Sequence, residues 1–178
     1  LRTVSGSNAP NRKHHLRIPF SFRTSNWVWK LIFFRPKTYS TDPNRSPEWN
    51  RGAYLVSALG HCHECHTSRN FLGATKRSHS LAGTTYGPDN EKVPNITPDI
   101  ETGIGDWARE DITWLLQTGF LPDGDVVGSS MADVVEHSTS HLTAADQSAI
   151  AVYLQSLTPI HKHLHTNAKP EGNQTGAQ

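Results

Sequence analysis

Both cysteines of this 178-residue chain lie in one short stretch, Gly60-His61-Cys62-His63-Glu64-Cys65-His66. A C-x-x-C pair occurs in redox dithiols, in halves of zinc sites and in c-type haem attachment sites. A zinc site would need two further ligands, and a dithiol normally lies in a βαβ pattern that this sequence lacks. The histidine directly after the second cysteine completes C-x-x-C-H and favours haem. Cys62 and Cys65, one helical turn apart, would bond the two vinyl groups, and His66 would be the proximal iron ligand.

An iron held by His66 needs a ligand on its other face, and electron-transfer haems usually take Met or a second His there. The chain has one methionine, Met131, which we predict in a loop after a helix. Thioether ligation is common in high-potential haems, so the sequence predicts Met131 as the distal ligand. Alternatively, Met131 only fills a gap in the core, and His137 or His141 is the distal ligand.

Composition excludes several classes of protein. Hydrophobic residues make up 35% and charged residues 19% of a 19.7 kDa chain, which is too polar for a protein with many membrane spans and too aromatic for a disordered one. The longest apolar stretch, 27–34, is interrupted by Lys30 and is shorter than a membrane span requires. A net charge of +1 argues against nucleic-acid binding.

The charge is divided unevenly along the chain. Residues 1–48 hold nine Lys or Arg and two acidic residues, a charge of +7, whereas the remainder holds eight bases and fourteen acids, a charge of −6. Opposite charge and different composition predict separate structural units. We therefore expect a basic, aromatic and mostly irregular N-terminal extension over 1–48, a domain over 49–160 and a flexible tail over 161–178.

Three helices are predicted in the domain. The first covers 51–59 and leads into the cysteines, with Gly52 as a place where another backbone can approach closely. The second covers 110–118 and ends at Gly119. The last begins after Thr143 as N-cap and ends before Pro159. Between the first two, 67–105 reads as a long loop that wraps around a bound group. Terminal helices packed together with haem-lining loops between them predict an all-α domain of the class I cytochrome c type.

Several segments together resemble a known family, the cytochrome c subunits of periplasmic membrane-bound alcohol and sugar dehydrogenases. They are 49–56, 60–67, 94–99, 102–107 and 131–136. Members of that family are multihaem chains of class I type domains in tandem. The resemblance covers 1–160, because 1–48 looks like the connector between two such domains and residues 1–4 look like the end of a preceding helix. It implies one haem-binding part of a larger architecture.

The resemblance also assigns roles to individual residues. It implies that Cys62 and Cys65 form the thioether bonds, with His66 as the proximal and Met131 as the distal ligand. It also implies that Asn95, Thr97 and Trp107 lie along the edge of the haem. Ordinary turn chemistry would also account for the Asn and Thr. The sequence departs from the family at Ala108, where a helix-capping Ser or Thr is expected, and at His137, where a polar amide is expected.

The resemblance and the motif together predict a periplasmic c-type cytochrome that carries one covalent haem c and transfers single electrons. The expected partners are a quinoprotein or flavoprotein dehydrogenase as donor and a quinone or oxidase as acceptor, with any membrane association made through a partner. The chain itself would then catalyse no substrate reaction. The alternative is a haem enzyme, peroxidase-like or acting on a sulfur compound, with an open or weakly ligated sixth site.

Two further clusters have competing interpretations. The aromatic group Trp27, Trp29, Phe33 and Phe34 either packs against the haem domain, which we favour, or forms an amphipathic membrane anchor. The histidines of 161–165 either bind a surface metal or belong to a solvated tail, and the tail is the expected case.

Overall fold

The computed structural model describes residues 8–10, 12, 15, 16, 18, 21–87 and 90–164. The chain divides into two units, an N-terminal unit, Leu1–Thr38, and a helical unit, Tyr39–Gln178. The predicted resemblance of residues 1–4 to the end of a helix lies outside the described residues. None of the described helices has the length and apolarity needed to cross a membrane.

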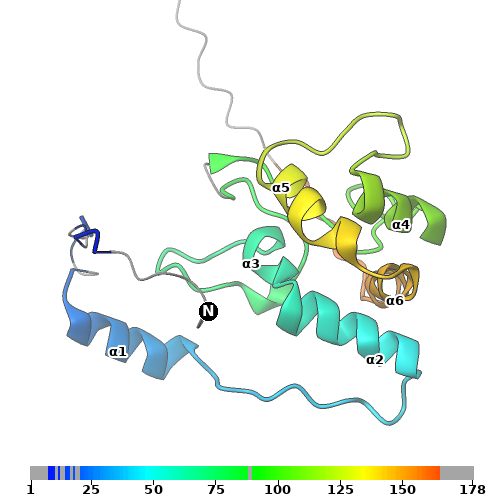
Figure 1. The fold of residues 1–178 in the computed structure, drawn as a ribbon. Coiled ribbons are helices and arrows are strands. Elements are labelled where there is room, and N and C mark those ends of the chain that lie inside the picture. Colours follow the sequence, from blue (N-terminus) through cyan, green and yellow to red (C-terminus); the bar gives the residue numbers. More distant parts are fainter. Residues whose placement is uncertain are drawn as a thin grey trace, which may run out of the picture. The chain divides into compact units, whose positions relative to one another are not determined.

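The described part of the N-terminal unit contains one helix, α1 (Arg23–Phe33), which the sequence analysis did not predict (Figure 1). The Ser25 hydroxyl donates to the carbonyl of Phe22 at 2.6 Å, and the rings of Trp29 and Phe33 lie 5.4 Å apart on one side of the helix. None of the residues of α1 is buried. The packing of its aromatic residues against the haem domain therefore stays a prediction.

The helical unit is all-α, as predicted. Its described regular elements are α2 (Pro47–Tyr54), the π-helical turn η1 (Leu55–Leu59), α3 (Cys62–His66), the 3-10 turn η2 (Arg77–His79), α4 (Arg109–Thr118), α5 (Ser129–His137), the 3-10 turn η4 (Thr139–His141) and α6 (Ala144–Gln155). The described residues form no β-strand, only single bridges between loops, such as Thr67 with Gly83. The predicted long loop over 67–105 holds none of the α-helices.

Two helix starts follow from N-cap chemistry. The hydroxyl of Ser46 accepts the N–H of Trp49 at 3.1 Å and Pro47 takes the first helical position, so α2 begins four residues before the predicted start. The hydroxyl of Thr143 accepts the N–H of Asp146 at 3.1 Å, which confirms the predicted cap of α6.

The structure also bears on the predictions made for Ala108 and for Met131. Ala108 offers no side-chain acceptor at the start of α4, but the carboxylate of Asp111 accepts its N–H at 2.8 Å, so that half of a capping box is present. The prediction of a loop around Met131 was wrong, because the residue lies in the first turn of α5. Gly128 is the N-cap of this helix, and Ser129 and Ser130 are its first two residues.

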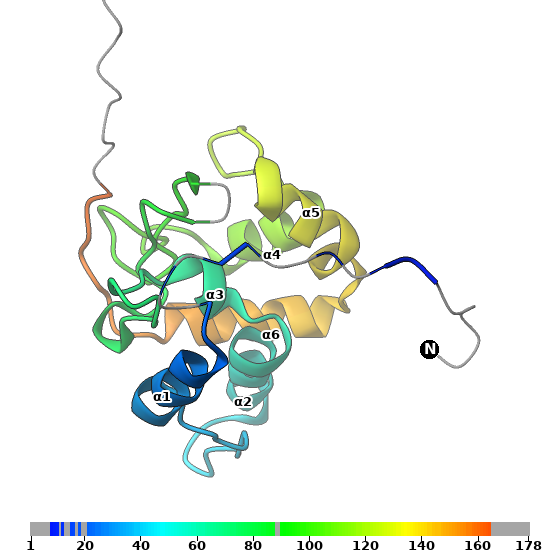
Figure 2. The same ribbon diagram turned by 90° about the vertical axis from the view of Figure 1, so that its left-hand side faces the viewer.

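Helices α2 and α6 pack against each other more extensively than any other described pair, and both ribbon views show them side by side (Figures 1 and 2). Gly52 makes this possible: a Cβ there would lie 2.6 Å from the carbonyl carbon of Ala149, closer still to its oxygen, and 2.8 Å from the Cβ of Tyr153. The predicted close approach at Gly52 is thus confirmed. The indole N–H of Trp49 donates to Ser156 at 2.5 Å across the same crossing.

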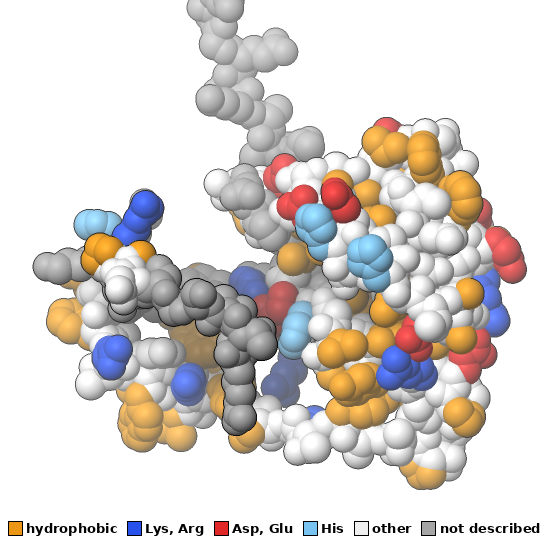
Figure 3. All heavy atoms as spheres, in the orientation of Figure 1, with side chains coloured by type: hydrophobic (Ala, Val, Ile, Leu, Met, Phe, Trp, Pro, Cys, Tyr) orange, Lys and Arg blue, Asp and Glu red, His pale blue; other side chains and the backbone are white. Residues whose placement is uncertain are grey.

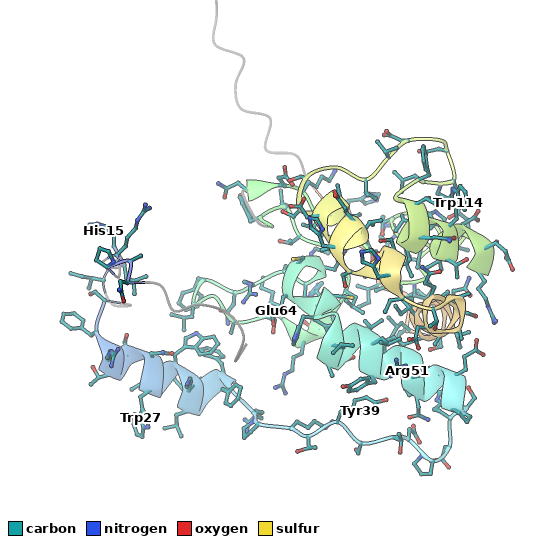
Figure 4. The ribbon with its side chains drawn as sticks, in the orientation of Figure 1. His15, Trp27, Tyr39, Arg51, Glu64 and Trp114 are labelled. Carbon is teal, nitrogen blue, oxygen red and sulfur yellow. The ribbon has the colours of Figure 1, made fainter. Side chains whose placement is uncertain are left out.

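The hydrophobic core lies where α2, η1, α4 and α6 meet. Its buried members come from η1, α4, α6 and the long loop: Leu55, Val56, Leu81, Ile104, Ile112, Leu116, Ile150, Ala151 and Leu154. Cys62 and Trp107 pack against this cluster from its edge. Trp114 points outward from α4 and Tyr39 lies beside α2 (Figure 4), where its hydroxyl donates to the carbonyl of Asn50 at 2.6 Å. The core thereby fixes the position of α3, which carries the cysteine motif.

Candidate haem attachment site

The two cysteines lie one turn apart on α3, and both thiols are free and partly buried. The turn is entered through His61, whose φ of 51° lies in the left-handed region. Burial raises the pKa of Cys62 to about 11, so the thiol is neutral. Spacing and exposure fit two thioether bonds to one planar group lying against the helix.

His66 is the last residue of α3 and is buried. Its Nδ1 lies 2.9 Å from the carbonyl oxygen of Pro94. Because a carbonyl can only accept, Nδ1 carries the proton and Nε2 keeps a free lone pair. Burial also lowers the pKa of His66, which favours the neutral ring. A neutral imidazole whose second nitrogen is held by a backbone carbonyl is the form in which histidine binds iron.

Asn95 and Thr97 are buried directly after Pro94, and the structure gives their polar groups protein partners. The Asn95 side-chain oxygen accepts from the N–H and the hydroxyl of Thr97, at 2.9 and 2.8 Å. Its amide nitrogen donates to the hydroxyl of Thr102 at 2.9 Å and to the carbonyl of Ile160 at 2.8 Å. These bonds use the full hydrogen-bonding capacity of the amide. The observed role of both residues is to fix the loop that presents the Pro94 carbonyl.

The segment after α6 is the main feature that sequence reasoning missed. The N–H of Ile160 donates to the hydroxyl of Thr97 at 3.1 Å, and that of Lys162 donates to the hydroxyl of Thr102 at 3.1 Å. The Lys162 ammonium donates to Ser68 and to the carbonyl of Gly83. Nothing in the local sequence marks these positions, since each partner lies 60 or more residues away. Residues 160–162 thus close the loop behind His66.

Thr67, next to the proximal histidine, helps to hold the same loop. Its buried hydroxyl accepts the N–H of Leu81 at 3.0 Å, and the carbonyl of His66 accepts the N–H of Gly83 at 2.7 Å. Trp107 is partly buried against the core, and its carbonyl accepts from the side chain of Gln155 at 3.0 Å. Its position ties the end of the long loop to α6.

Met131 is partly buried on α5, whereas His137 and His141 are exposed at the end of α5 and in η4. Helix α5 packs against α4 and η4, whereas α3 packs against η1. Ser129, the first residue of α5, has a φ of 50°, so the backbone there is in the left-handed region. Assignment of Met131 to the distal position stays a prediction.

The residues present fit a c-type haem. Two thiols at helical spacing, a neutral buried imidazole and, on α5, a thioether are the types of donor that such a group requires. The Nδ1 of His63, within the motif, is buried without a hydrogen-bond partner in the described part of the chain. Buried nitrogen atoms are rarely left unpaired, so its environment is suited to a further group beside α3.

An all-α unit with terminal helices crossing at a glycine, and a C-x-x-C-H histidine held by a backbone carbonyl, has the features of a c-type cytochrome domain. The chain is 42% identical over 178 residues to the fructose dehydrogenase cytochrome subunit of Gluconobacter japonicus, covering 99% of this chain and 34% of that protein. It is 42% identical over 160 residues to a diheme cytochrome c-type protein of Cereibacter sphaeroides, covering 90% and 52%. The gluconate 2-dehydrogenase cytochrome c subunit of Pantoea cypripedii is 34% identical over 154 residues, covering 83% and 35%.

These relatives confirm the predicted resemblance to cytochrome c subunits of dehydrogenases. No family model matches the chain. The chain spans about a third to a half of the length of the relatives it matches.

Proposed function

We propose that this chain transfers single electrons through one haem c attached by thioether bonds to Cys62 and Cys65, with His66 and Met131 as the axial ligands. The group supplies a one-electron ferric–ferrous couple when bound. The observation that carries the proposal is the buried C-x-x-C-H histidine whose Nδ1 donates to Pro94, because it leaves Nε2 ready to ligate. One haem follows from one cysteine pair in the chain.

The protein part of this function is positioning and exclusion of water. Pro94 orients the imidazole, and the Asn95 bonds to Thr97, Thr102 and Ile160 keep that carbonyl in place. A soft thioether from Met131 favours ferrous iron and so raises the reduction potential. We also propose that Asn95, Thr97 and Trp107 contact the edge of the haem. Because the polar side-chain atoms of Asn95 and Thr97 already have protein partners, these contacts would be made by the loop backbone and by apolar side-chain surfaces.

The names of the relatives suggest the partners. They include cytochrome subunits of fructose dehydrogenase, of alcohol dehydrogenase (quinone) and of gluconate 2-dehydrogenase. By analogy, we place this chain in the periplasm as a non-catalytic subunit that accepts electrons from a quinoprotein or flavoprotein dehydrogenase and passes them to a quinone or oxidase. Membrane association would be made through such a partner.

Acid–acetone extraction tests the covalent attachment. Haem should stay with the parent polypeptide and should be extracted from the Cys62→Ser/Cys65→Ser double variant, since thioether bonds survive the treatment and axial ligation does not. Free thiols at Cys62 and Cys65 in the unfolded parent, titrated with a thiol reagent, would overturn the proposal.

Carbon monoxide binding tests the distal ligand. The ferrous parent should bind the gas poorly, whereas Met131→Ala should bind it readily and show a lower reduction potential, because its sixth position is open. His137→Ala and His141→Ala serve as matched controls and should behave like the parent. A parent that binds carbon monoxide as readily as Met131→Ala would instead support the haem-enzyme alternative with an open sixth site.

A further inference from the structure

A second group of ligand-type side chains, none of which belongs to the cysteine motif, lies on the surface. The potential donor atoms of Glu101, His161 and His163 all lie within 4.8 Å of one another, and all three residues are exposed. The rings of the two histidines are 4.7 Å apart and nearly perpendicular. Two imidazoles and a carboxylate at this spacing are within reach of one metal ion.

The backbone that carries the histidines is fixed. Ile160 and Lys162 donate their N–H groups inward, to Thr97 and Thr102, at 3.1 Å each. The Lys162 side chain also turns inward, where it donates to Ser68 at 3.2 Å. In an extended segment, alternate side chains point to opposite sides, so His161 and His163 share the outer side. The two rings are therefore held as a pair, unlike histidines in a solvated tail.

A carboxylate lies behind one of the rings. The Oδ1 atom of Asp99 is 3.3 Å from the Nδ1 atom of His161 and accepts from the N–H and hydroxyl of Thr102, at 2.8 and 2.7 Å. Carboxylates in this position orient histidine rings that bind metal ions. An open surface pocket, with Glu101 and His163 in its lining, leaves room for bound water.

We propose that Glu101, His161 and His163 form a binding site for a divalent transition-metal ion such as Zn²⁺, with Asp99 orienting His161 and water completing the coordination. Imidazole nitrogen and carboxylate oxygen are common zinc ligands, and sites with three protein ligands and one water are well known among zinc proteins. This site is separate from the haem iron and does not depend on the proposed electron transfer.

Isothermal titration of the haem-loaded protein with Zn²⁺, after dialysis against a chelator, tests the proposal. The parent should bind one equivalent, and His163→Ala should bind at least about tenfold more weakly, in line with the loss of a protein ligand. Glu101→Gln should also weaken binding. His15→Ala, which removes an exposed histidine of the N-terminal unit (Figure 4), should leave the titration unchanged.

Visible spectra that match the parent show that each variant keeps its fold and haem. The proposal would be overturned by a parent that releases no heat of zinc binding, or by a His163→Ala/Glu101→Gln double variant that binds zinc as tightly as the parent. If His15→Ala weakened zinc binding as much as His163→Ala does, zinc would be bound by scattered surface histidines, and the proposed site would be rejected.

Discussion

The proximal side of the candidate haem site and its distal segment are built differently. The proximal side comprises α3, the loop 67–105 and residues 160–162, and its polar side chains bond to partners from all three parts. The distal segment, residues 119–138, carries Met131 on a helix with one buried residue, Val135. The proposed proximal ligand, His66, is held by a network, and the proposed distal ligand, Met131, is held by a short helix on the surface.

Two residues with left-handed backbone show the contrast. Leu81, with a φ of 62°, is almost fully buried, its N–H donates to Thr67 and its carbonyl accepts from Ile96. Ser129, with a φ of 50°, is exposed beside Gly128, where an added Cβ would meet nothing within 4 Å. Strained backbone persists where its surroundings over-determine it, as they do at Leu81. At Ser129 there is room for the chain to relax.

The difference indicates that the two proposed ligand positions, His66 and Met131, differ in their tolerance to substitution. The geometry of His66 is set by the folded protein, whereas the segment that carries Met131 can adjust to what it binds. Hydrophobic side chains are also exposed over this segment (Figure 3), including Phe120 and Val126 at 45% and 54% exposure. Substitutions on the proximal side should therefore change stability, and those on the distal side should change ligation first.

The largest expected effect is at the helix crossing that supports the proximal side. Gly52→Ala should lower the free energy of unfolding by about 3 kcal/mol or more, because the new Cβ collides with the backbone of Ala149. Gly128→Ala, in the open distal segment, is the matched control and should change it by less than about 0.5 kcal/mol. Urea titration of the haem-loaded proteins measures both. Equal effects at the two glycines would remove the contrast between the two sides.

Asn95→Ala should have the next largest effect. It leaves buried groups of Thr97, Thr102 and Ile160 without their partner, and each unpaired buried group costs about 1–3 kcal/mol before the site relaxes. We expect a net loss of about 2–3 kcal/mol in urea titration, together with a shifted reduction potential as the Pro94 carbonyl moves. Asn95→Asp keeps the acceptor for Thr97 but puts a carboxylate oxygen against the carbonyl of Ile160, so it should not restore the lost stability. A stable Asn95→Ala with the parent's potential would show that the network does not position His66.

Substitutions at Ser129, in the distal segment, should change the stability less, and in opposite directions for Val and Gly. Ser129→Val should lower stability by about 1 kcal/mol, because a β-branched side chain disfavours the left-handed backbone. Ser129→Gly should keep or slightly raise stability, since glycine adopts this backbone without strain. Carbon monoxide association measured beside thermal unfolding separates the two roles. If Val and Gly behave alike, the backbone strain at the start of α5 has no energetic weight.

The smallest effect is the pH dependence of the Arg51–Asp146 ion pair between α2 and α6. Its two bonds are 2.7 and 2.9 Å long, and the hydrogen bond from Arg51 holds the pKa of Asp146 below its ordinary value of 3.8. The unfolded chain takes up the proton first, so the stabilisation is present above that value and is lost as the pH falls below it.

Because Arg51 is half exposed, the surrounding water and salt weaken the pair. Arg51→Gln should lower the stability slightly at pH 7 and less at pH 3, as followed by urea titration at several pH values. A constant cost across this range would mean that Arg51 acts through packing and not through its charge.

Local chemistry accounts for what the sequence could predict. The cysteine motif, the Thr143 cap and the small residue at Gly52 each act through neighbours in the chain or through one steric demand, and all three appear in the structure. Helix α1 escaped prediction because it is rich in aromatic and β-branched residues, which have modest helix propensity, and has no capping side chain at Phe22.

Long-range hydrogen bonds account for what the sequence could not predict. The partners of Asn95 include Ile160, which is 65 residues away, and no periodic pattern connects such positions. The sequence indicated only that Asn95 lies in a loop near the haem. Likewise, the glycine and serines before Met131 have turn character, and the helix there depends on Val135 packing beside α4.

The crossing of α2 and α6 also limits when the protein can complete its fold. Trp49 and Ser156, which bond across it, are 107 residues apart, so the crossing cannot form until nearly the whole helical unit has been synthesised. Contacts between such distant positions form late and slowly. Cys62 and Cys65 lie between the two helices in sequence, and are therefore in an open chain for most of synthesis. The polypeptide can thus receive its cofactor while unfolded and close around it afterwards.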